Sequence, residues 1–390
     1  MQIYVQVTAS SYNPKNNSLF REGPMSLSIG IVGLPNVGKS TVFNVLTGAQ
    51  NAEIANYPFC TIHPNRAIVP LPDVRLEKLA ELVKVPKVIH ASVEFVDIAG
   101  LVKGAHQGEG LGNKFLGNIR ETAAILHVVR CFDDPNVVHV SANPQPREDI
   151  ETIEVELALA DLEQVERKIE RLSSAVKGDK KVQPTFQLAL SLRDHLAGGL
   201  PASTFSRIED ENFQSINHEL KLLTAKPMII VANVDESCLA EPNPYLLETR
   251  HAAAERGFEV VVLCAKLEDE LMEIDAVDRD EYLALAGIQA GGLDQVIRNS
   301  FAMLDLISFF TFNQQEARAW NISRGTTASK AAGEIHTDFE HGFIRAEVIP
   351  FQTFAQFGSS SAVKSAGLLR LEGKEYIVQD GDVIYFRLNV

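Results

Sequence analysis

The eight residues Gly33–Ser40, with the sequence GLPNVGKS, constrain the fold of this chain more than any other segment. They follow the apolar run Leu27–Val32 and precede a helix-like segment that starts at Thr41. Glycines at both ends of such a loop let backbone N–H groups turn inward, and the following helix directs its positive dipole end to the same point. The segment therefore predicts a phosphate-binding loop (P-loop) between a strand and a helix, rather than a glycine-rich turn with an incidental lysine.

Two side chains of this loop have chemical roles of their own. Lys39 supplies a positive charge for the β- and γ-phosphates, and Ser40 supplies a hydroxyl ligand for Mg²⁺. We expect the phosphate contacts to come from Gly33, Pro35, Asn36, Val37, Gly38, Lys39, Ser40 and Thr41.

Length and charge limit the remaining possibilities. A chain of 390 residues with a hydrophobic fraction of 45% is long enough for two or three domains with real cores. The formal net charge of -15 argues against binding nucleic acid by bulk charge, so an RNA contact requires a local basic patch. Four scattered cysteines without a secretory leader indicate reduced thiols in the cytoplasm, and the absence of a long apolar stretch predicts no membrane span.

Short apolar runs rich in β-branched residues predict a parallel sheet covered on both faces, and therefore an α/β fold. About ninety residues separate the run that ends near Cys131 from the one that begins at Pro227, which indicates an inserted domain. The predicted strands are Leu27–Val32, Val93–Val96, Ile125–Val129, Met228–Val231 and Val260–Leu263.

The inserted segment shows a helical repeat. From Asp149 to Ser173 apolar residues recur at steps of three and four between charged ones, which predicts a long amphipathic helix. A second stretch, Pro184–Leu196, can return against it and form a helical hairpin of the coiled-coil type. The pattern leaves open whether this arm only packs on the nucleotide domain or also binds a partner.

From about Asp305 the pattern changes to that of a compact α+β module. An Asp380-Gly381 pair between two short apolar runs, Tyr376–Val378 and Val383–Phe386, predicts a β-hairpin. The other predicted elements are strands at Phe309–Phe312, Ala317–Ile322 and Phe343–Ile349 and a helix at Thr327–Ile335.

These patterns divide the chain into four parts. The first 24 residues are polar and precede Met25, so we expect an extension that is disordered or non-native, with the functional start at Met25. The predicted ranges are 1–24 for this extension, 25–136 plus 227–304 for the nucleotide-binding domain, 137–226 for the helical insertion and 305–390 for the C-terminal module.

A second motif follows the P-loop at the end of a predicted strand. In Asp97-Ile98-Ala99-Gly100, Asp97 can hold Mg²⁺ through a water molecule and the Gly100 N–H can contact the γ-phosphate. The glycine-rich loop beyond it is expected to change order with nucleotide state. Between the two motifs, Thr61 is the candidate to close over Mg²⁺ and the γ-phosphate.

Together these segments resemble the YchF family of Obg-like ATPases. The resemblance is carried by GLPNVGKS, YPFCTIHPN, DIAGLVKGAHQGEGLGNKFL, IIVANVDE and AAGEIHTDFEHGFIRAEVI, and it extends from about Met25 to Val390. It implies a Ras-like nucleotide domain interrupted by a helical coiled-coil domain and followed by a TGS domain, a module with the β-grasp fold. It also implies association with the ribosome.

The base-recognition box indicates adenine. GTPases of this class bind guanine with Asn-Lys-x-Asp, whereas this chain has Asn233-Val234-Asp235-Glu236. Val234 lacks the lysine stem that covers the base, and the Glu236 carboxylate lies one methylene further out. Asp235 could shift the register, but we keep Glu236 as the last member of the box. Backbone atoms near Val234 can pair with adenine, and the resemblance likewise implies a preference for ATP. A second base-side loop is expected at Cys264, Ala265 and Lys266.

Catalysis lacks one usual group. Leu101 stands where many GTPases have a glutamine that orients water, so we expect slow intrinsic hydrolysis. Asn36 occupies the position at which related proteins coordinate K⁺ beside the phosphates, so a monovalent cation can stand in for an arginine finger. His106 and His139 are candidate contacts to water or phosphate, although isolated histidines are more often structural.

The sequence thus predicts a cytoplasmic, Mg²⁺-dependent ATPase that forms ADP and phosphate and changes conformation between the two nucleotide states. Two alternatives stay open: a GTP-dependent ribosome-assembly factor, and a nucleotide-sensing adaptor whose hydrolysis is vestigial. RNA or protein partners are possible at the TGS and helical domains.

Overall fold

The computed structural model describes residues 28–53, 65–98, 111–134, 143–272 and 291–389, together with positions 274, 278, 282 and 283. The predicted extension, residues 1–24, lies outside the described residues.

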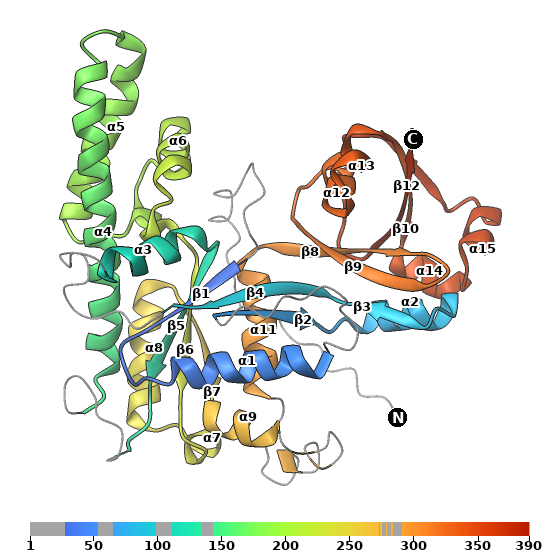
Figure 1. The fold of residues 1–390 in the computed structure, drawn as a ribbon, viewed down its shortest axis with the longest axis horizontal. Coiled ribbons are helices and arrows are strands. Elements are labelled where there is room, and N and C mark those ends of the chain that lie inside the picture. Colours follow the sequence, from blue (N-terminus) through green and yellow to red (C-terminus); the bar gives the residue numbers. More distant parts are fainter. Residues whose placement is uncertain are drawn as a thin grey trace.

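A six-stranded sheet forms the centre of the nucleotide-binding part, in the order β2-β4-β1-β5-β6-β7 (Figure 1). Five of its strands are parallel, and β2 pairs antiparallel with β4 at one edge. The five predicted strands are confirmed, whereas the antiparallel edge strand was not predicted. The strands are β1 (Ser28–Val32), β2 (Arg66–Leu71), β4 (Ala91–Asp97), β5 (Ala124–Arg130), β6 (Met228–Asn233) and β7 (Glu259–Leu263).

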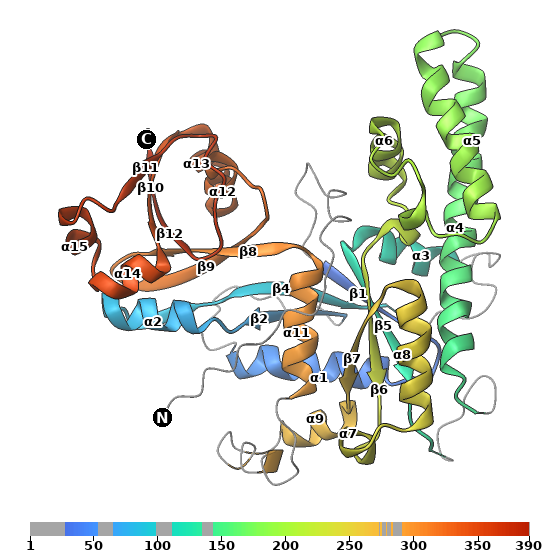
Figure 2. The same cartoon turned by 180° about the vertical axis from the view of Figure 1, so that it is seen from behind.

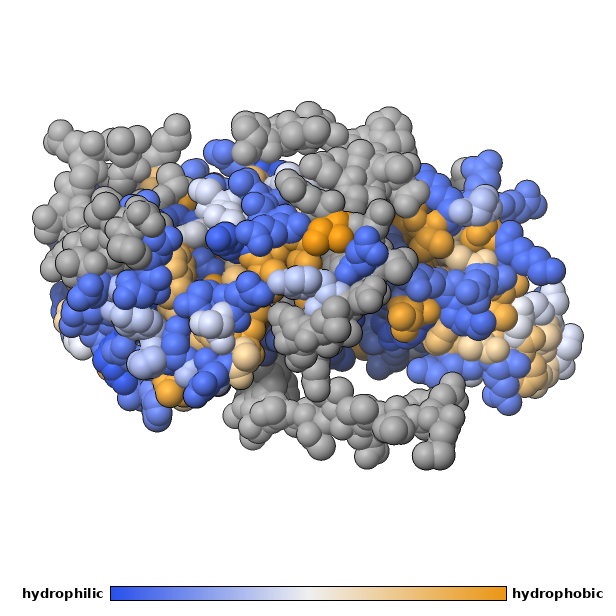
Figure 3. Space-filling model, turned by 90° about the horizontal axis from the view of Figure 1, so that it is seen from below, coloured by the Kyte–Doolittle hydropathy of each residue, from blue (hydrophilic) through white to orange (hydrophobic). Residues whose placement is uncertain are grey.

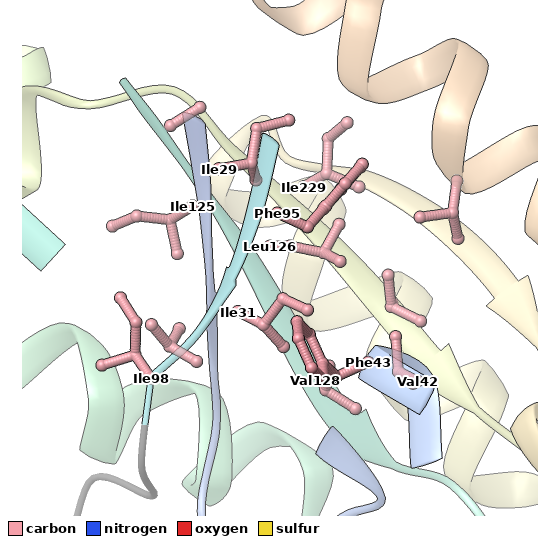
Figure 4. Close-up of a cluster of buried hydrophobic side chains, with 14 of the residues drawn as sticks. Ile29, Ile31, Val42, Phe43, Phe95, Ile98, Ile125, Leu126, Val128 and Ile229 are labelled. Atoms are coloured by element: carbon pink, nitrogen blue, oxygen red, sulfur yellow. The ribbon is translucent and has the colours of Figure 1, made fainter. Parts of the chain in front are cut away.

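Helices bury this sheet. Every residue of β1 and of β5 is buried, as expected for parallel strands that are covered on both faces. Figure 4 shows Ile31 and Val128 of these neighbouring strands beside Val42 and Phe43 of the first helix. The helices of this part are α1 (Lys39–Glu53), α3 (Leu111–Glu121), α7 (Ser237–Ala240), α8 (Pro244–Arg256), α9 (Ala265–Leu271) and α11 (Gly292–Met303).

The insertion is a helical arm that projects from one end of the molecule, away from the C-terminal module (Figures 1 and 2). Its first helix, α4 (Pro146–Ala175), has 30 residues and packs against α5 (Gln183–Ala197), which confirms the predicted hairpin. The unpredicted α6 (Glu211–Leu220) adds Phe213 to the arm's own apolar core. The short 3-10 helices are η4 (Lys180–Val182), η5 (Ala202–Thr204) and η6 (Leu223–Ala225).

The C-terminal module contains a second six-stranded sheet, in the order β11-β10-β12-β8-β9-β3. The strands predicted at 309–312, 317–322 and 343–349 and the helix at 327–335 are confirmed. The elements are β3 (Lys87–Ile89), β8 (Leu306–Phe312), β9 (Glu316–Ser323), β10 (Phe343–Pro350), β11 (Arg370–Glu372), β12 (Asp382–Leu388), α12 (Ala328–Ile335), α13 (Thr337–His341), α14 (Phe351–Phe357) and α15 (Ser360–Ser365).

The predicted hairpin around Asp380-Gly381 is wrong. Residues 376–378 form no strand, since Ile377 makes only an isolated bridge with Thr327, and β12 pairs with β10 and β8 instead. The Asp380 carboxylate accepts hydrogen bonds from the Ser308 N–H at 3.0 Å and from Arg75 at 2.7 Å. The turn therefore docks on distant residues rather than joining two adjacent strands.

One segment early in the chain belongs structurally to the C-terminal module. β3 pairs in parallel with β9, and α2 (Val74–Val83) packs beside α14. Leu76 and Leu79 of α2 lie in one apolar cluster with Phe310 and Phe354. The predicted division assigned residues 74–89 to the nucleotide-binding domain, whereas they complete the C-terminal sheet and its core.

On the face seen in Figure 3, hydrophilic side chains cover most of the coloured surface, with apolar ones in separate patches between them. None of the helices in the described part of the chain is long and apolar enough to cross a membrane.

Candidate nucleotide-binding site

The P-loop has the backbone conformation that its glycines allow. Gly38 has a φ of 97°, and a Cβ at this position would lie 2.2 Å from Nδ2 of Asn233. At Gly33 a Cβ would lie 2.5 Å from the carbonyl oxygen of Val128. Asn36 adopts a φ of 61°, a left-handed conformation that asparagine tolerates better than most residues. The loop is thus a tight turn that joins β1 to the N-terminus of α1.

Lys39 is held inside this turn. Its side chain is buried, and Nζ donates a hydrogen bond to the carbonyl oxygen of Leu34 at 2.7 Å. Burial lowers the pKa of Lys39 to about 8, while Asp97 acts in the opposite direction. Burial likewise raises the pKa of the Asp97 carboxyl, against the effect of Lys39. The lysine is therefore a poorly solvated cation next to the position where phosphate charge would enter.

The donor set at this edge of the sheet fits Mg²⁺. Ser40 is exposed in the first turn of α1, and Asp97 ends β4, where its neighbour across the ladder is Ile31. A hydroxyl and a carboxylate are the hard oxygen ligands that Mg²⁺ takes together with nucleotide phosphates. The other predicted site residues, Thr61, Gly100, His106 and His139, lie outside the described residues, as does Leu101.

Asn233 connects the P-loop to both base-side loops. Its Nδ2 donates to the Val37 carbonyl at 3.0 Å, and its Oδ1 accepts from the Ala265 N–H at 3.2 Å. Its backbone carbonyl accepts from the Cys131 N–H at 2.8 Å. This asparagine therefore holds the three loops in register rather than pointing its amide at a base.

Val234 lies below the loop surface. Its side chain is buried in the apolar cluster under the base-side loops, and its N–H donates to the Leu263 carbonyl at 2.9 Å. The Val234 N–H is therefore not available to adenine, and the predicted backbone contact near Val234 would have to come from a neighbouring residue.

Asp235 and Glu236 have separate roles. One Asp235 oxygen accepts from the Cys238 N–H at 2.9 Å and from the Ser237 hydroxyl at 2.7 Å at the start of α7. Glu236 is exposed and accepts a hydrogen bond from the Tyr282 hydroxyl at 2.9 Å. Asp235 thus stabilises its own turn, which leaves Glu236 as the carboxylate at the surface of the box.

The second base-side loop joins β7 to α9. Cys264 is buried, and burial raises the pKa of its thiol. The Ala265 N–H is bonded to Asn233 as described, whereas the Lys266 side chain is 86% exposed, with Nζ 3.9 Å from a Glu270 oxygen.

Two residues near the site carry no motif that the sequence could reveal. Tyr282 lies 46 positions beyond its partner Glu236. His127 lies in the apolar run of β5 and is buried, and burial together with nearby Lys39 lowers its pKa to about 3. Its Nδ1 has no hydrogen-bond partner within the described residues. A histidine inside an apolar run gives no pattern that distinguishes it from a core residue.

The loop geometry, the strand-end aspartate and the two base-side loops on a mainly parallel sheet define a P-loop nucleotide-binding protein with a GTPase-like domain. A family model described as "50S ribosome-binding GTPase" matches residues 28–168, and the YchF-GTPase_C model, described as a protein of unknown function, matches residues 306–389. The chain belongs to the YchF family, as its sequence resemblance indicated.

Similarity to individual relatives extends over nearly the whole chain. It is 52% identical to the "Ribosome-binding ATPase YchF" of Haemophilus influenzae and 50% identical to that of Bacillus subtilis, each over 94% of this chain and 100% of the relative. The solved YchF GTPase of Schizosaccharomyces pombe superposes with a TM-score of 0.85 at 33% identity, covering 94% of this chain and 99% of that one.

Proposed function

We propose that this protein binds ATP with Mg²⁺, hydrolyses it to ADP and phosphate, and uses the two nucleotide states to regulate an association with the ribosome. The observation that carries the choice of nucleotide is the base-recognition box. Val234 is buried in the core, and Glu236 is bonded to Tyr282. Neither residue reproduces the lysine stem or the aspartate that guanine recognition uses.

The names of the relatives support the activity and the partner. The Haemophilus influenzae and Bacillus subtilis proteins are named ribosome-binding ATPases, whereas the Schizosaccharomyces pombe structure is titled a GTPase. These names agree that the relatives are nucleoside triphosphatases and differ on whether the base is adenine or guanine. The box chemistry supports ATP.

The chain's own residues divide the work of hydrolysis. Backbone N–H groups of the P-loop bind the phosphates, and Lys39 places its charge between the β- and γ-phosphates. Ser40 and Asp97 would hold Mg²⁺, which neutralises charge that develops on the phosphate oxygens. Asn36, exposed at the tip of the loop, would hold K⁺. Leu101 cannot orient water, so hydrolysis is slow without a partner.

The test is calorimetric titration of the purified protein with ATP, GTP and ADP, with and without K⁺. We expect at least tenfold tighter binding of ATP than of GTP, since a missing guanine contact removes orders of magnitude in discrimination. K⁺ is expected to raise the hydrolysis rate, with Na⁺ at the same ionic strength as the control. Tighter binding of GTP than of ATP would contradict the proposal.

The second candidate function is that of a GTP-dependent assembly factor, which is favoured by the match of residues 28–168 to the 50S ribosome-binding GTPase model. The same titration separates the two candidates. An adaptor with vestigial hydrolysis would instead keep its cellular function when Lys39 is replaced by alanine.

A further inference from the structure

One hydrogen bond links the base-recognition box to a residue outside every motif. The Tyr282 hydroxyl donates to Oε1 of Glu236 at 2.9 Å. Glu236 is exposed and Tyr282 is 38% exposed, so the bond lies at the surface of the base-side loops and not in the core.

The backbone beside Tyr282 is anchored under the same loops. Leu283 packs against the apolar cluster that contains Val234 and Cys264, one residue from each base-side loop. Glu236 is the main cause that raises the pKa of the Tyr282 phenol, with smaller effects of burial, Glu270 and Cys264. The phenol therefore lies among charged and polar groups of both loops, held there by its neighbour.

Within the described box, Glu236 is more exposed than Asp235 and better placed for the guanine-facing role. Asp235 uses one carboxylate oxygen for the Cys238 N–H and the Ser237 hydroxyl. To bind guanine, a box carboxylate must accept from the ring N1–H and the 2-amino group, one with each oxygen. Because Oε1 of Glu236 already accepts from Tyr282, binding guanine in this way requires that oxygen to share its lone pairs between the phenol and the base, or the carboxylate to turn away from Tyr282.

We propose that Tyr282 is a specificity-determining positioning residue, whose hydroxyl holds Glu236 in an orientation that disfavours acceptance of both guanine hydrogens by its carboxylate. Tyr282 acts through Glu236 and not on the base itself. The discrimination is directed against guanine, because adenine has neither an N1–H nor a 2-amino group that could donate a hydrogen bond to the carboxylate. The inference rests on the proposed preference for ATP and names a residue that produces it.

The test is the Tyr282→Phe variant, which removes the hydroxyl and keeps the ring. Equilibrium binding of ATP, GTP and ITP is measured, where ITP keeps the N1–H and lacks the 2-amino group. We expect GTP to bind roughly threefold to tenfold more tightly than to the unaltered protein, the range for one hydrogen bond to a charged but solvated group. ITP should gain less, and ATP affinity should change less than twofold. Tyr385→Phe, at an exposed tyrosine of the C-terminal module, is the matched control and should leave all three affinities unchanged.

A second variant shows whether Tyr282 acts through Glu236. In a Glu236→Ala background, Tyr282→Phe should no longer alter the ratio of GTP to ATP affinity, because the carboxylate that it orients is gone. A change of the same size in that background would overturn the inference.

The remaining outcomes distinguish this inference from the proposed function. If the unaltered protein binds GTP more tightly than ATP, the preference for ATP fails. If it prefers ATP and Tyr282→Phe leaves the ratio within twofold, only the role of Tyr282 fails. Equal loss of ATP and GTP affinity in Tyr282→Phe would indicate that the phenol contacts the nucleotide directly, which also overturns the positioning role.

Discussion

At the scale of single residues, the site depends on residues whose burial or backbone conformation costs folding free energy. Lys39 is a buried cation with a pKa lowered to about 8, and Gly38 has a backbone conformation and a contact that exclude a side chain. Neither feature stabilises the protein without a ligand. Both prepare a positive, tightly turned loop for phosphate, a case of local strain retained for binding.

The lowered pKa of Lys39 predicts that ATP affinity falls at alkaline pH. Phosphate favours the charged amine, so the pKa is higher in the complex than in the free protein, and binding takes up a proton above pH 8. Affinity is therefore constant below the free-state pKa and falls above it, by roughly tenfold or more between pH 7 and 9.5. Titrations in buffers of different ionisation enthalpy measure the proton uptake directly.

The control for this prediction is Lys39→Arg, whose guanidinium stays charged throughout this range. Its binding, although weaker, should show no such fall between pH 7 and 9.5. An equally steep fall in that variant would assign the pH dependence to another group.

At the scale of helices and strands, a buried charge pair fixes the base of the arm. Asp161 of α4 is fully buried and accepts hydrogen bonds from Arg120 at 3.2 Å and from the N–H groups of Leu223 and Thr224, each at 2.8 Å. Arg120 also donates to the carbonyl oxygens of Leu220 and of residues 160 and 221. Arg120 lies on α3. This helix, the part of α4 that leads into the arm and residues 220–224 that lead out of it therefore share one network of hydrogen bonds.

Removing one partner of this pair should destabilise the protein strongly. Asp161→Ala removes the carboxylate that pairs with Arg120 and leaves the buried Leu223 N–H and the half-buried Thr224 N–H without their acceptor, so we expect a loss of about 3–5 kcal/mol in the free energy of unfolding. Urea denaturation followed by circular dichroism measures this loss. Glu219→Ala, which breaks an exposed pair with Lys168, is the control and should cost at most about 1 kcal/mol. Similar losses in the two variants would show that Asp161 contributes no more than a surface charge.

Elements with strong local patterns could be predicted from the sequence, and elements stabilised only by distant contacts could not. The P-loop, the five apolar strands and the arm's two long helices each have a periodicity or a motif of their own. β3 has three residues and exists because it pairs with β9. The Asp380-Gly381 turn was interpreted as a hairpin because its main partner, Arg75, lies far away in sequence. The Tyr282–Glu236 bond was missed for the same reason.

At the scale of the whole molecule, the C-terminal module depends on the first part of the chain. α2 supplies Leu76 and Leu79 to the module's core, and Arg75 bonds Asp380 and lies 5.3 Å from the centre of the Phe310 ring. The nucleotide-binding sheet and the C-terminal sheet are joined by a short stretch, since β3 ends at Ile89 and β4 begins at Ala91. The two sheets are therefore covalently and sterically coupled at the end of β4 opposite to Asp97.

This dependence predicts that residues 305–390 do not fold alone. A fragment of this range lacks β3 and α2, so the apolar surface around Phe310, Phe354 and Val383 loses the helix that covers it. Burial of a single leucine contributes about 1.5–3 kcal/mol, so losing both Leu76 and Leu79 removes a large part of the stability of a module of this size. Differential scanning calorimetry of the fragment should therefore show no cooperative transition.

Adding the missing segment in trans provides the decisive comparison. A peptide of residues 73–91 should restore a cooperative transition whose midpoint rises with peptide concentration, as mass action requires. The same peptide with Leu76→Ala and Leu79→Ala is the matched control and should restore little, because the two side chains that fill the module's core are missing. A cooperative transition of the fragment that is unaffected by either peptide would show that the C-terminal sheet is an independent domain, and that α2 and β3 only lie against it.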